Sequence, residues 1–242
     1  GNSFRSPKDK SHSPAIDLFS EYKISSKQSL LFNMVGKILQ TNYDYSYTEN
    51  VNENNSHFEY GVEGKRKSLI TEIMHTYSLK NLSWDSGLRY KYSDTHNLYS
   101  YDIINDFDSK DQNLYAYTQF FGNVKNIYYM GGIGINWVSF KEGGNSFNKV
   151  LYRPLGRIKY MPLDNFSMSY QFSMQPTIPS LSTLSGITKS LNRYEFETGN
   201  SALHPYDNIK HKLSLSWNPN RWYISLNYNI ESAKNLFAPG IY

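Results

Sequence analysis

The side chains that could bind a metal or perform acid–base chemistry are spread along this 242-residue chain rather than grouped in motifs. The six histidines are His12, His57, His75, His96, His204 and His211. No two of them have the H-x-x-x-H or H-E-x-x-H spacing that places ligands on one face of a helix. The sequence therefore predicts separate strand or surface histidines, and it leaves open only a zinc site assembled from distant loops.

Carboxylates are densest in residues 102–111, which contain Asp102, Asp106, Asp108 and Asp111. Calcium prefers several oxygen ligands, so this segment could offer them. It lacks the glycine and the distal glutamate of an EF-hand loop. We therefore expect a solvated loop here and no metal site.

Nucleophilic catalysis and nucleotide binding have no sequence signature. There is no G-x-S-x-G element, and serines are so frequent that a Ser/His/Asp trio would be accidental. Gly131, Gly132 and Gly134 form a G-x-G element, but no helical pattern follows it, and glycine within a strand more often marks a bend or a close backbone approach. The absence of cysteine excludes disulfides, thiolate zinc sites and cysteine nucleophiles. We expect no catalytic residue and no cofactor, and hence a protein that is not an enzyme.

The composition favours an all-β chain. Aromatic residues make up 16% of it, with 22 Tyr and 13 Phe, and residues that favour helices are scarce. No window approaches 18 consecutive apolar residues, which excludes a transmembrane helix. The net charge of +4 comes from scattered Lys and Arg, so we expect no nucleic-acid partner.

Apolar and polar residues alternate through ten segments, as in strands with one apolar and one polar face. In one of them Met168 and Tyr170 alternate with Ser167 and Ser169. The ten predicted strands are 13–24, 28–47, 57–78, 82–93, 112–122, 126–141, 149–161, 165–175, 207–217 and 221–235. Each is long enough to cross a bilayer as a tilted strand, although a break near Gly61 to Gly64 could divide the third.

The predicted connections alternate between short and long along the whole chain. The short ones are 25–27, 79–81, 123–125, 162–164 and 218–220. The long ones are 48–56, 94–111, 142–148 and 176–206. Short turns at one end and long loops at the other are typical of bacterial outer-membrane barrels. Trp84, Trp217 and Trp222 lie near short turns, and Tyr90 and Tyr92 lie at the other end of their strand, as expected for aromatic girdles at two membrane interfaces.

The longest connection carries a recognisable motif. It opens with Gln175 and Pro176, and it ends with a run that contains Gly199, Asn200, Leu203 and Pro205. This resembles the Gly-Asn-Pro-x-Leu-x-Pro signature in the barrel of TonB-dependent outer-membrane receptors, particularly of the Bacteroides type. Ser201 stands where the family usually has proline, and Tyr206 stands where glutamate is frequent.

The resemblance implies an all-β fold of antiparallel up-and-down strands in an outer-membrane β-barrel. About ten strands are present, and transporter barrels of this type have about 22, so we expect part of a larger barrel. We expect residues 1–12 to be a flexible segment and residues 13–242 to be the barrel. The apolar face would contact outer-membrane lipid, and the polar face would line the lumen.

The function implied is uptake of a large nutrient, such as a glycan, siderophore or similar chelate. The loops 94–111 and 176–206 would contribute to capture of this unknown ligand, and the TonB system would act through a plug domain that is not in this chain. A ten-strand piece would have two open edges, so edge-to-edge self-association is expected.

Two alternatives remain at this point. One is a self-contained small outer-membrane barrel that acts as a pore, adhesin or enzyme. The other is a soluble β-sandwich that binds carbohydrate through exposed aromatic residues. Low Lys and Glu content on the polar faces of 165–175 and 221–235 argues against the sandwich, since a solvated face normally carries more charge.

Overall fold

A computed structural model describes residues 2–51, 54–100, 104–142, 145–179, 181–184, 188–190, 196–200, 202–234 and 236. The large sheet has 11 strands in the order β1-β3-β4-β5-β6-β7-β8-β9-β12-β13, with β2 also paired to β3. Its strands are β1 Asn2–His12, β2 Ala15–Ser25, β3 Gln28–Val51, β4 Asn54–Ser78, β5 Leu82–Ser100, β6 Ile104–Val124, β7 Ile127–Glu142, β8 Asn145–Leu163, β9 Phe166–Thr177, β12 Tyr206–Trp217 and β13 Ile224–Lys234. Between β9 and β12 lie α1 Leu181–Leu184, β10 Thr188–Ser190 and β11 Phe196–Thr198. Among the described residues, no helix is long and apolar enough to cross a membrane.

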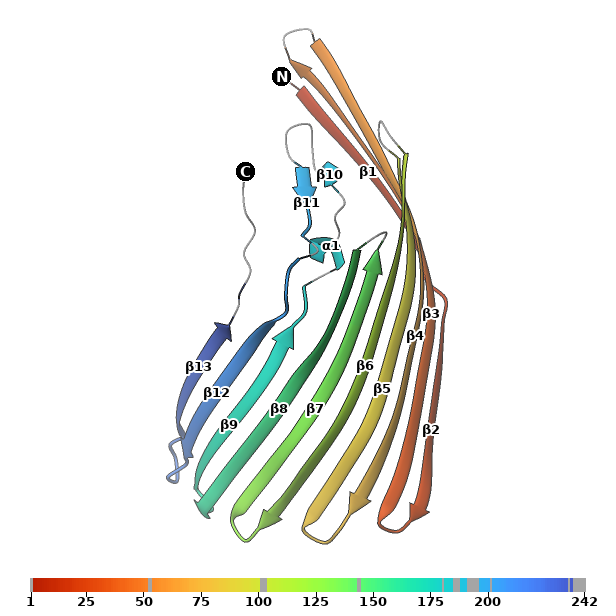
Figure 1. Cartoon of the computed structure of the whole chain (residues 1–242). Helices are drawn as coiled ribbons and strands as arrows, with labels where there is room; N and C mark the ends of the chain where they lie inside the picture. The colour runs from red at the N-terminus through yellow and green to blue at the C-terminus, as the bar shows by residue number, and fades with distance from the viewer. Residues whose placement is uncertain are drawn as a thin grey trace.

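The ten predicted strands are confirmed, each as one strand of a curved antiparallel sheet (Figure 1). From β2 to β9, every strand pairs with the next strand along the chain, and β12 and β13 continue the series. This is the up-and-down arrangement that the sequence predicted. The soluble sandwich required two large packed sheets, but the only other sheet among the described residues is the two-stranded pair β10–β11.

The five predicted short turns all lie at one end of the sheet, the lower end in Figure 1. Two of them contain a residue with positive φ, Lys125 at 50° and Asn220 at 54°. In these two turns, the left-handed backbone matches the twist of the paired strands. The position of the five short turns at one end of the sheet is therefore confirmed.

The predicted long loops at the other end were mostly wrong in extent. Strand pairing runs from Val51↔Asn54 through the β3–β4 hairpin and from Ser100↔Ile104 through the β5–β6 hairpin, so most of 48–56 and 94–111 is strand. Likewise β7–β8 pairing extends to Glu142↔Asn145. Backbone hydrogen bonding does not require an apolar face, so the hairpins continue beyond the alternating region. Only 178–205 remains a long connection.

The break considered near Gly61 to Gly64 does not occur, since β4 is continuous there. A Cβ at Gly64 would lie 2.6 Å from the Thr41 Oγ1 atom, so neighbouring side chains fill the space above this residue. The glycine therefore marks a close approach rather than a turn.

Residues 1–12 were left out of the predicted strands, but the structure pairs Asn2–His12 with the outer half of β3. The reason is geometric. β3 is 24 residues long and β2 covers only Gln28 to Lys37 of it, so the remainder has a free edge. The flexibility expected of this segment concerns its dynamics and stays a prediction.

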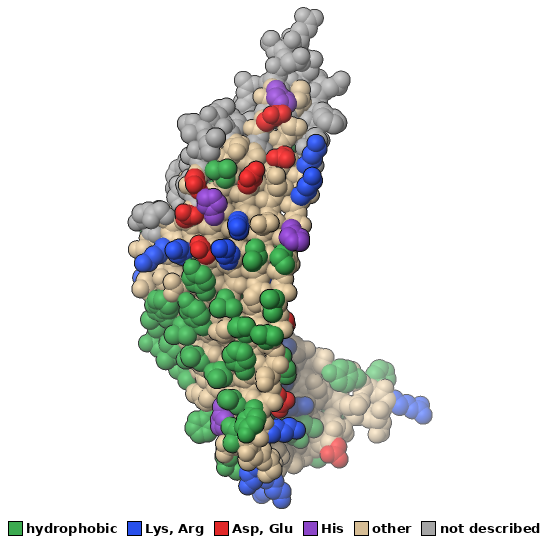
Figure 2. All heavy atoms as spheres, turned by 90° about the vertical axis from the view of Figure 1, so that its right-hand side faces the viewer, with side chains coloured by type: hydrophobic (Ala, Val, Ile, Leu, Met, Phe, Trp, Pro, Cys, Tyr) green, Lys and Arg blue, Asp and Glu red, His purple; other side chains and the backbone are tan. Residues whose placement is uncertain are grey.

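Residues directly opposite each other in neighbouring strands lie on the same face of the sheet. The strand pairing therefore assigns each residue to a face, and it shows that one face is apolar and the other is polar. On the face called the outer face here, one row from β3 to β7 comprises Phe32, Ile73, Leu88, Ala116 and Ile135. The adjacent row on the inner face comprises Asn33, Glu72, Arg89, Tyr115 and Asn136. Figure 2 shows part of the outer face as a continuous apolar band. Soluble proteins rarely expose such a surface.

Aromatic residues lie at both ends of the outer face. Trp84 and Trp217 lie beside the short turns with 53% and 46% of their surface exposed, and Trp222 lies within the last turn. Tyr90 and Tyr92 share the outer face with Leu88 further along β5. These are the positions that the aromatic-girdle hypothesis requires.

Both edges of the sheet are open within the described part of the chain. β13 has β12 as its only partner, β2 pairs only with β3, and every residue of β2 and β13 is exposed. A self-contained barrel of these strands would need its first and last strands to pair. That pairing is absent from the described ladder, whereas a part of a larger barrel has such edges.

Candidate functional site

The connection between β9 and β12 folds onto the inner face near the upper ends of β7 and β8 (Figure 1). Leu184 of α1 is 2% exposed and packs against Val138, Phe140 and Phe147. This is the hydrophobic core cluster of the described residues, and Leu151, Ile178 and Leu203 pack at its border. This cluster fixes the connection to the wall.

The four motif residues predicted from the resemblance lie in this anchored segment. The Asn200 amide donates to the Thr183 carbonyl over 2.7 Å, and the Asn200 Oδ1 atom accepts from the Ala202 amide over 2.9 Å. Leu203 borders the apolar cluster, and Gly199 precedes Asn200 half-buried. These contacts give the motif a structural role, because Asn200 ties the end of the connection back to α1.

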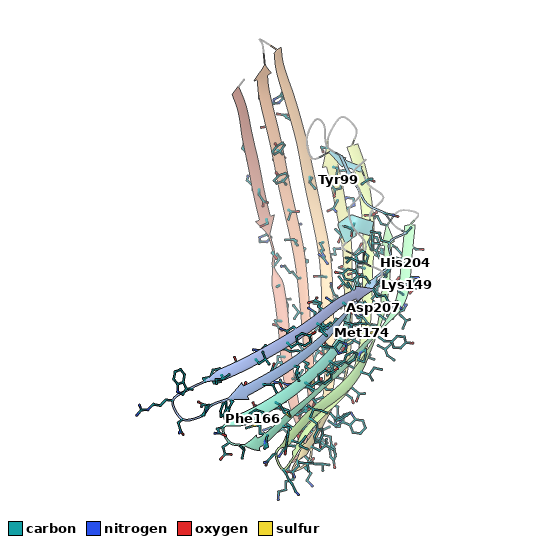
Figure 3. All side chains as sticks on the ribbon, turned by 90° about the vertical axis from the view of Figure 1, so that its left-hand side faces the viewer. Tyr99, Lys149, Phe166, Met174, His204 and Asp207 are labelled. Atoms are coloured by element: carbon teal, nitrogen blue, oxygen red, sulfur yellow. The ribbon has the colours of Figure 1, made fainter. Side chains whose placement is uncertain are left out.

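Pro205, the last motif residue, lies beside a small cavity of about 230 Å³ at the ends of β8, β9 and β12. Met174, His204 and Asp207 line it as well and gather in one region of Figure 3. In the structure, Leu203 therefore lies at the inner wall, and Pro205 lies at this cavity. Direct contact of the motif with a ligand stays a prediction.

A cluster of cations and aromatic rings occupies the middle of the inner face. The Arg89 and Arg153 guanidinium groups, from strands on either side of β6, each lie 5.4 Å from the centre of the Tyr115 ring. Tyr115 stacks on Tyr117 with 5.3 Å between ring centres, and the Tyr117 hydroxyl donates to a Glu72 carboxylate oxygen over 3.2 Å. Sequence reasoning missed this cluster, because only the ladder register brings the four strands together.

Glycines make room for this cluster. A Cβ on Gly87 would overlap the Tyr117 ring, and one on Gly134 would overlap the Tyr115 ring. Gly131, Gly132 and Gly134 lie within β7, which leads into β8 and not into a helix. The interpretation of the G-x-G element as strand glycines at close approaches is therefore confirmed.

The inner face also holds buried polar atoms without hydrogen-bond partners among the described residues. They are Asn33 Oδ1, Arg66 Nε, Asn136 Oδ1, Arg153 Nε and Asn208 Oδ1. All five residues alternate with outer-face positions and so belong to the inner face. Buried polar groups normally find a protein or water partner, so this face is suited to contact with water, another domain or a polar ligand.

His96 is not the separate histidine that the sequence predicted. Its Nδ1 atom lies 2.9 Å from Asp108 Oδ1 and 3.2 Å from Asp106 Oδ1, across the β5–β6 hairpin. The hydrogen bond to Asp108, followed by the charge of Asp106, raises the pKa of His96 above its ordinary value of 6.5. The missed signal was again the register, which places His96 opposite Asp108.

These three side chains could offer ligand atoms to a metal, since the atoms lie within 4.8 Å of one another, but all three are exposed. The other predicted carboxylates do not join them. Asp111 lies on the inner face 3.7 Å from the Lys91 Nζ atom, and Asp102 lies outside the described residues. An ion pair on the hairpin surface accounts for the His96 geometry.

No family model and no curated protein matches this chain. Solved structures match it closely in fold. The ferric-catecholate import receptor Fiu from E. coli K12, in its closed form, gives a TM-score of 0.68 at 11% identity, over 93% of this chain and 41% of the receptor. The copper transporter OprC gives 0.66 at 10% identity, over 93% of this chain and 39% of the transporter. The ferric yersiniabactin uptake receptor FyuA from Yersinia pestis gives a TM-score of 0.59 at 10% identity, over 95% of this chain and 37% of the receptor.

These likenesses establish the fold, and the chain spans less than half the length of each matched protein. Other matches include the alcaligin outer membrane receptor FauA from Bordetella pertussis. The Bacteroides subtype is not tested by any of these matches and stays a prediction.

Proposed function

We propose that this chain, which has the fold of a barrel wall in outer-membrane receptors of the TonB-dependent type, forms part of such a receptor and serves uptake of a large nutrient. The observation that carries the proposal is the single up-and-down sheet with an exposed apolar outer face and a polar inner face. In a bilayer, that arrangement places lipid outside and a hydrated lumen inside. The location that follows is the bacterial outer membrane.

The inner face supports a polar, partly anionic ligand class. Arg89 and Arg153 flank Tyr115, and cations beside an aromatic ring favour ligands that combine negative charge with a planar group. Siderophores and similar chelates have this character, and the solved structures that resemble the chain include receptors named for ferric chelates. A glycan would instead use the stacking surface of the tyrosines.

The remaining parts of the mechanism lie in loops and partners. The connection 178–205, anchored through Leu184 and Asn200, lies over the inner wall at the end opposite the short turns, where a ligand would enter. Energy would come from the TonB system through a plug domain. The proposed role is transport, and it uses no catalytic residue.

The test is an uptake assay with the complete reading frame that encodes this chain. The gene is expressed in a bacterial strain without its own ferric-chelate receptors, and uptake of a panel of ⁵⁵Fe-labelled chelates is measured with and without TonB. We expect TonB-dependent accumulation of at least one chelate. The double variant R89Q/R153Q should reduce it, whereas R221Q, an exposed position outside the inner face cluster, should not.

Two results would contradict the proposal. Uptake that persists unchanged in the strain without TonB would indicate a passive pore. Failure of every chelate and every glycan tested, with the protein present in the outer membrane at normal abundance, would exclude nutrient uptake.

A further inference from the structure

The sheet is divided between the upper parts of β8 and β9. These two strands pair only as far as Leu155↔Ser173. Beyond that point, β8 continues with β7 as its only strand partner, and β9 continues with β12 as its only strand partner, within the described sheet. Figure 1 shows β8 rising above the upper end of β9. We call this unpaired stretch the seam, and it comprises residues 145–154 of β8 and residues 174–177 of β9.

Two prolines account for the end of the pairing. The Met161 amide donates on the β7 side, so the odd-numbered residues of β8 hydrogen-bond with β7 and the even-numbered residues face β9. The Asn165 carbonyl accepts on the β12 side, so the even-numbered residues of β9 face β8. Pro154 and Pro176 therefore both face the seam, and neither has an N–H group to donate. An opening at the seam breaks no ladder hydrogen bond, whereas elsewhere in the wall it would leave backbone groups unpaired.

The small cavity of about 230 Å³ lies in this seam. Its lining comes from both faces of the sheet, since Lys149 belongs to the inner face, and Val150 and Tyr152 belong to the outer face. Val150 and Tyr152 are 53% and 54% exposed, so the outer margin of the seam is apolar. The cavity is amphipathic, because its lining also includes Met174, His204 and Asp207, which gather near Lys149 in Figure 3.

The cationic cluster of the inner face adjoins the seam. Arg153 lies between Tyr152 and Pro154 on β8, and its guanidinium group lies 5.4 Å from the centre of the Tyr115 ring. Successive residues of a strand point to opposite faces, so Arg153 points inward where Tyr152 points outward. A ligand whose charged head binds beside Arg153 is therefore one residue away from an opening to the outer face.

We propose that the ligand of this receptor wall carries an apolar chain, and that this chain passes through the seam. The head group stays in the lumen at Arg89 and Arg153, and the chain lies against Val150 and Tyr152 on the outer face. The ligand class is therefore an amphipathic nutrient, such as a metal chelate with a fatty acyl tail. Removal of that tail from water stabilises the complex in proportion to its apolar area. The inference deepens the proposed function and rests on it, because it requires a hydrated lumen inside and lipid outside.

The test measures binding of two matched probes to the complete receptor in lipid nanodiscs. The probes are a ⁵⁵Fe-loaded tris-catecholate chelate with a dodecanoyl chain and the same chelate without the chain. The seam variant is Tyr152→Cys/Pro176→Cys, at positions that would be opposite each other if the β8–β9 pairing continued. A bis-methanethiosulfonate reagent bridges the two cysteines, and dithiothreitol removes the bridge. The control Gly156→Cys/Phe172→Cys is bridged in the paired part of the same two strands.

We expect the seam bridge to lower the affinity for the acylated probe by roughly tenfold or more, since the return of only two methylene groups to water has an effect of this size. Affinity for the probe without the chain should not change. Dithiothreitol should restore binding of the acylated probe, and the control bridge should affect neither probe.

Three results would overturn the inference. They are unchanged affinity for the acylated probe, an equal loss for both probes, and an equal loss with the control bridge. A bilayer lipid could also insert an acyl chain into the seam. In that case the bridge reduces the phospholipid that native mass spectrometry finds bound to the receptor, while affinity for the acylated probe is unchanged, and the inference about the ligand fails.

A second readout separates this inference from the proposed function. Trp137 is opposite Val150 on the outer face beside the seam, whereas Trp84 lies beside the short turns. A bromine atom at the end of the acyl chain should quench the fluorescence that Trp137→Phe removes, and it should spare the fluorescence that Trp84→Phe removes. Binding of both probes without quenching of Trp137 means that the seam inference fails while the receptor function stands. Absence of binding by either probe contradicts the proposed ligand class itself, and this inference with it.

Discussion

Gly87 and Gly36 are both strand glycines, but only Gly87 is overlain by an aromatic ring. A Cβ on Gly87 would overlap the Tyr117 ring, whereas one on Gly36 would meet nothing within 4 Å. We therefore expect Gly87→Ala to reduce the free energy of unfolding by about 1–3 kcal/mol, the usual cost of overpacking. The measurement is a urea titration of the protein in lipid vesicles, followed by tryptophan fluorescence.

The matched control for Gly87 is Gly36→Ala, which should be neutral or slightly stabilising because glycine in a strand is entropically unfavourable. Adding Tyr117→Ala should remove most of the effect of Gly87→Ala, since the ring that causes the clash is then gone. Equal destabilisation by both alanine variants would show that the ring contact is not the cause.

The ion pair of His96 predicts a pH dependence confined to the β5–β6 hairpin. The pKa of His96 is raised in the folded protein, so the pair stabilises the hairpin fully below about pH 6.5, the ordinary histidine pKa. This stabilisation disappears as the pH rises through the raised folded pKa. Hydrogen exchange of the hairpin amides, after correction for intrinsic rates, should therefore increase on going from acidic to alkaline pH.

Single variants can test which of the two carboxylates raises the pKa of His96 more. Asp108→Asn should lower the pKa of His96 more than Asp106→Asn does, because the hydrogen bond to Asp108 is the largest cause of the shift. The pKa is read from an NMR titration of the imidazole ring, with the remote Asp17→Asn as control. A larger effect of Asp106→Asn, or an effect of Asp17→Asn, would contradict the assignment.

At the scale of elements, Leu184 is the buried apolar anchor of the connection between β9 and β12. Leu184→Ala would leave a cavity among Val138, Phe140 and Phe147, and such truncations cost about 2–5 kcal/mol. We expect the connection to detach while the sheet persists, so limited proteolysis within 178–205 should accelerate by roughly tenfold or more. His204→Ala, at an exposed neighbouring position, should leave the cleavage rate unchanged. If both variants are cleaved equally, the apolar cluster is not the anchor.

Elements were predictable where one face is apolar and the other polar. Alternation such as Met168 and Tyr170 against Ser167 and Ser169 located strand β9 and its outer face. The tip of the β3–β4 hairpin, residues 48–56, and the whole of β1 lack this alternation, so the tip was taken for a loop and β1 was left out of the predicted strands. The candidate functional site was harder to predict from the sequence. The motif drew attention to Leu203, but not to its contact with the Leu184 cluster. That contact, like the stacking of Arg89 and Arg153 on Tyr115, depends on strand register. Sequence alone does not fix the register.

At the scale of the whole molecule, the open edges predict how the chain behaves by itself. β2 and β13 are fully exposed, and each leaves one side of its backbone without a strand partner in the described sheet. In a complete barrel, further strands would pair with these edges, because unpaired backbone groups in hydrocarbon are costly. The chain expressed alone in detergent should therefore associate through its edges.

Analytical ultracentrifugation measures this association, in detergent solution whose solvent density matches that of the detergent. We expect dimers or larger species, and we expect the variant L226K/Y228K, which places two charges on the edge strand β13, to shift the chain toward monomer. The control L88K/I135K adds the same charges to interior strands of the outer face and leaves both edges unchanged, so it should stay associated. A monodisperse monomer of the unchanged chain would mean that its edges are covered, and the interpretation as part of a larger barrel would then lose its main structural support.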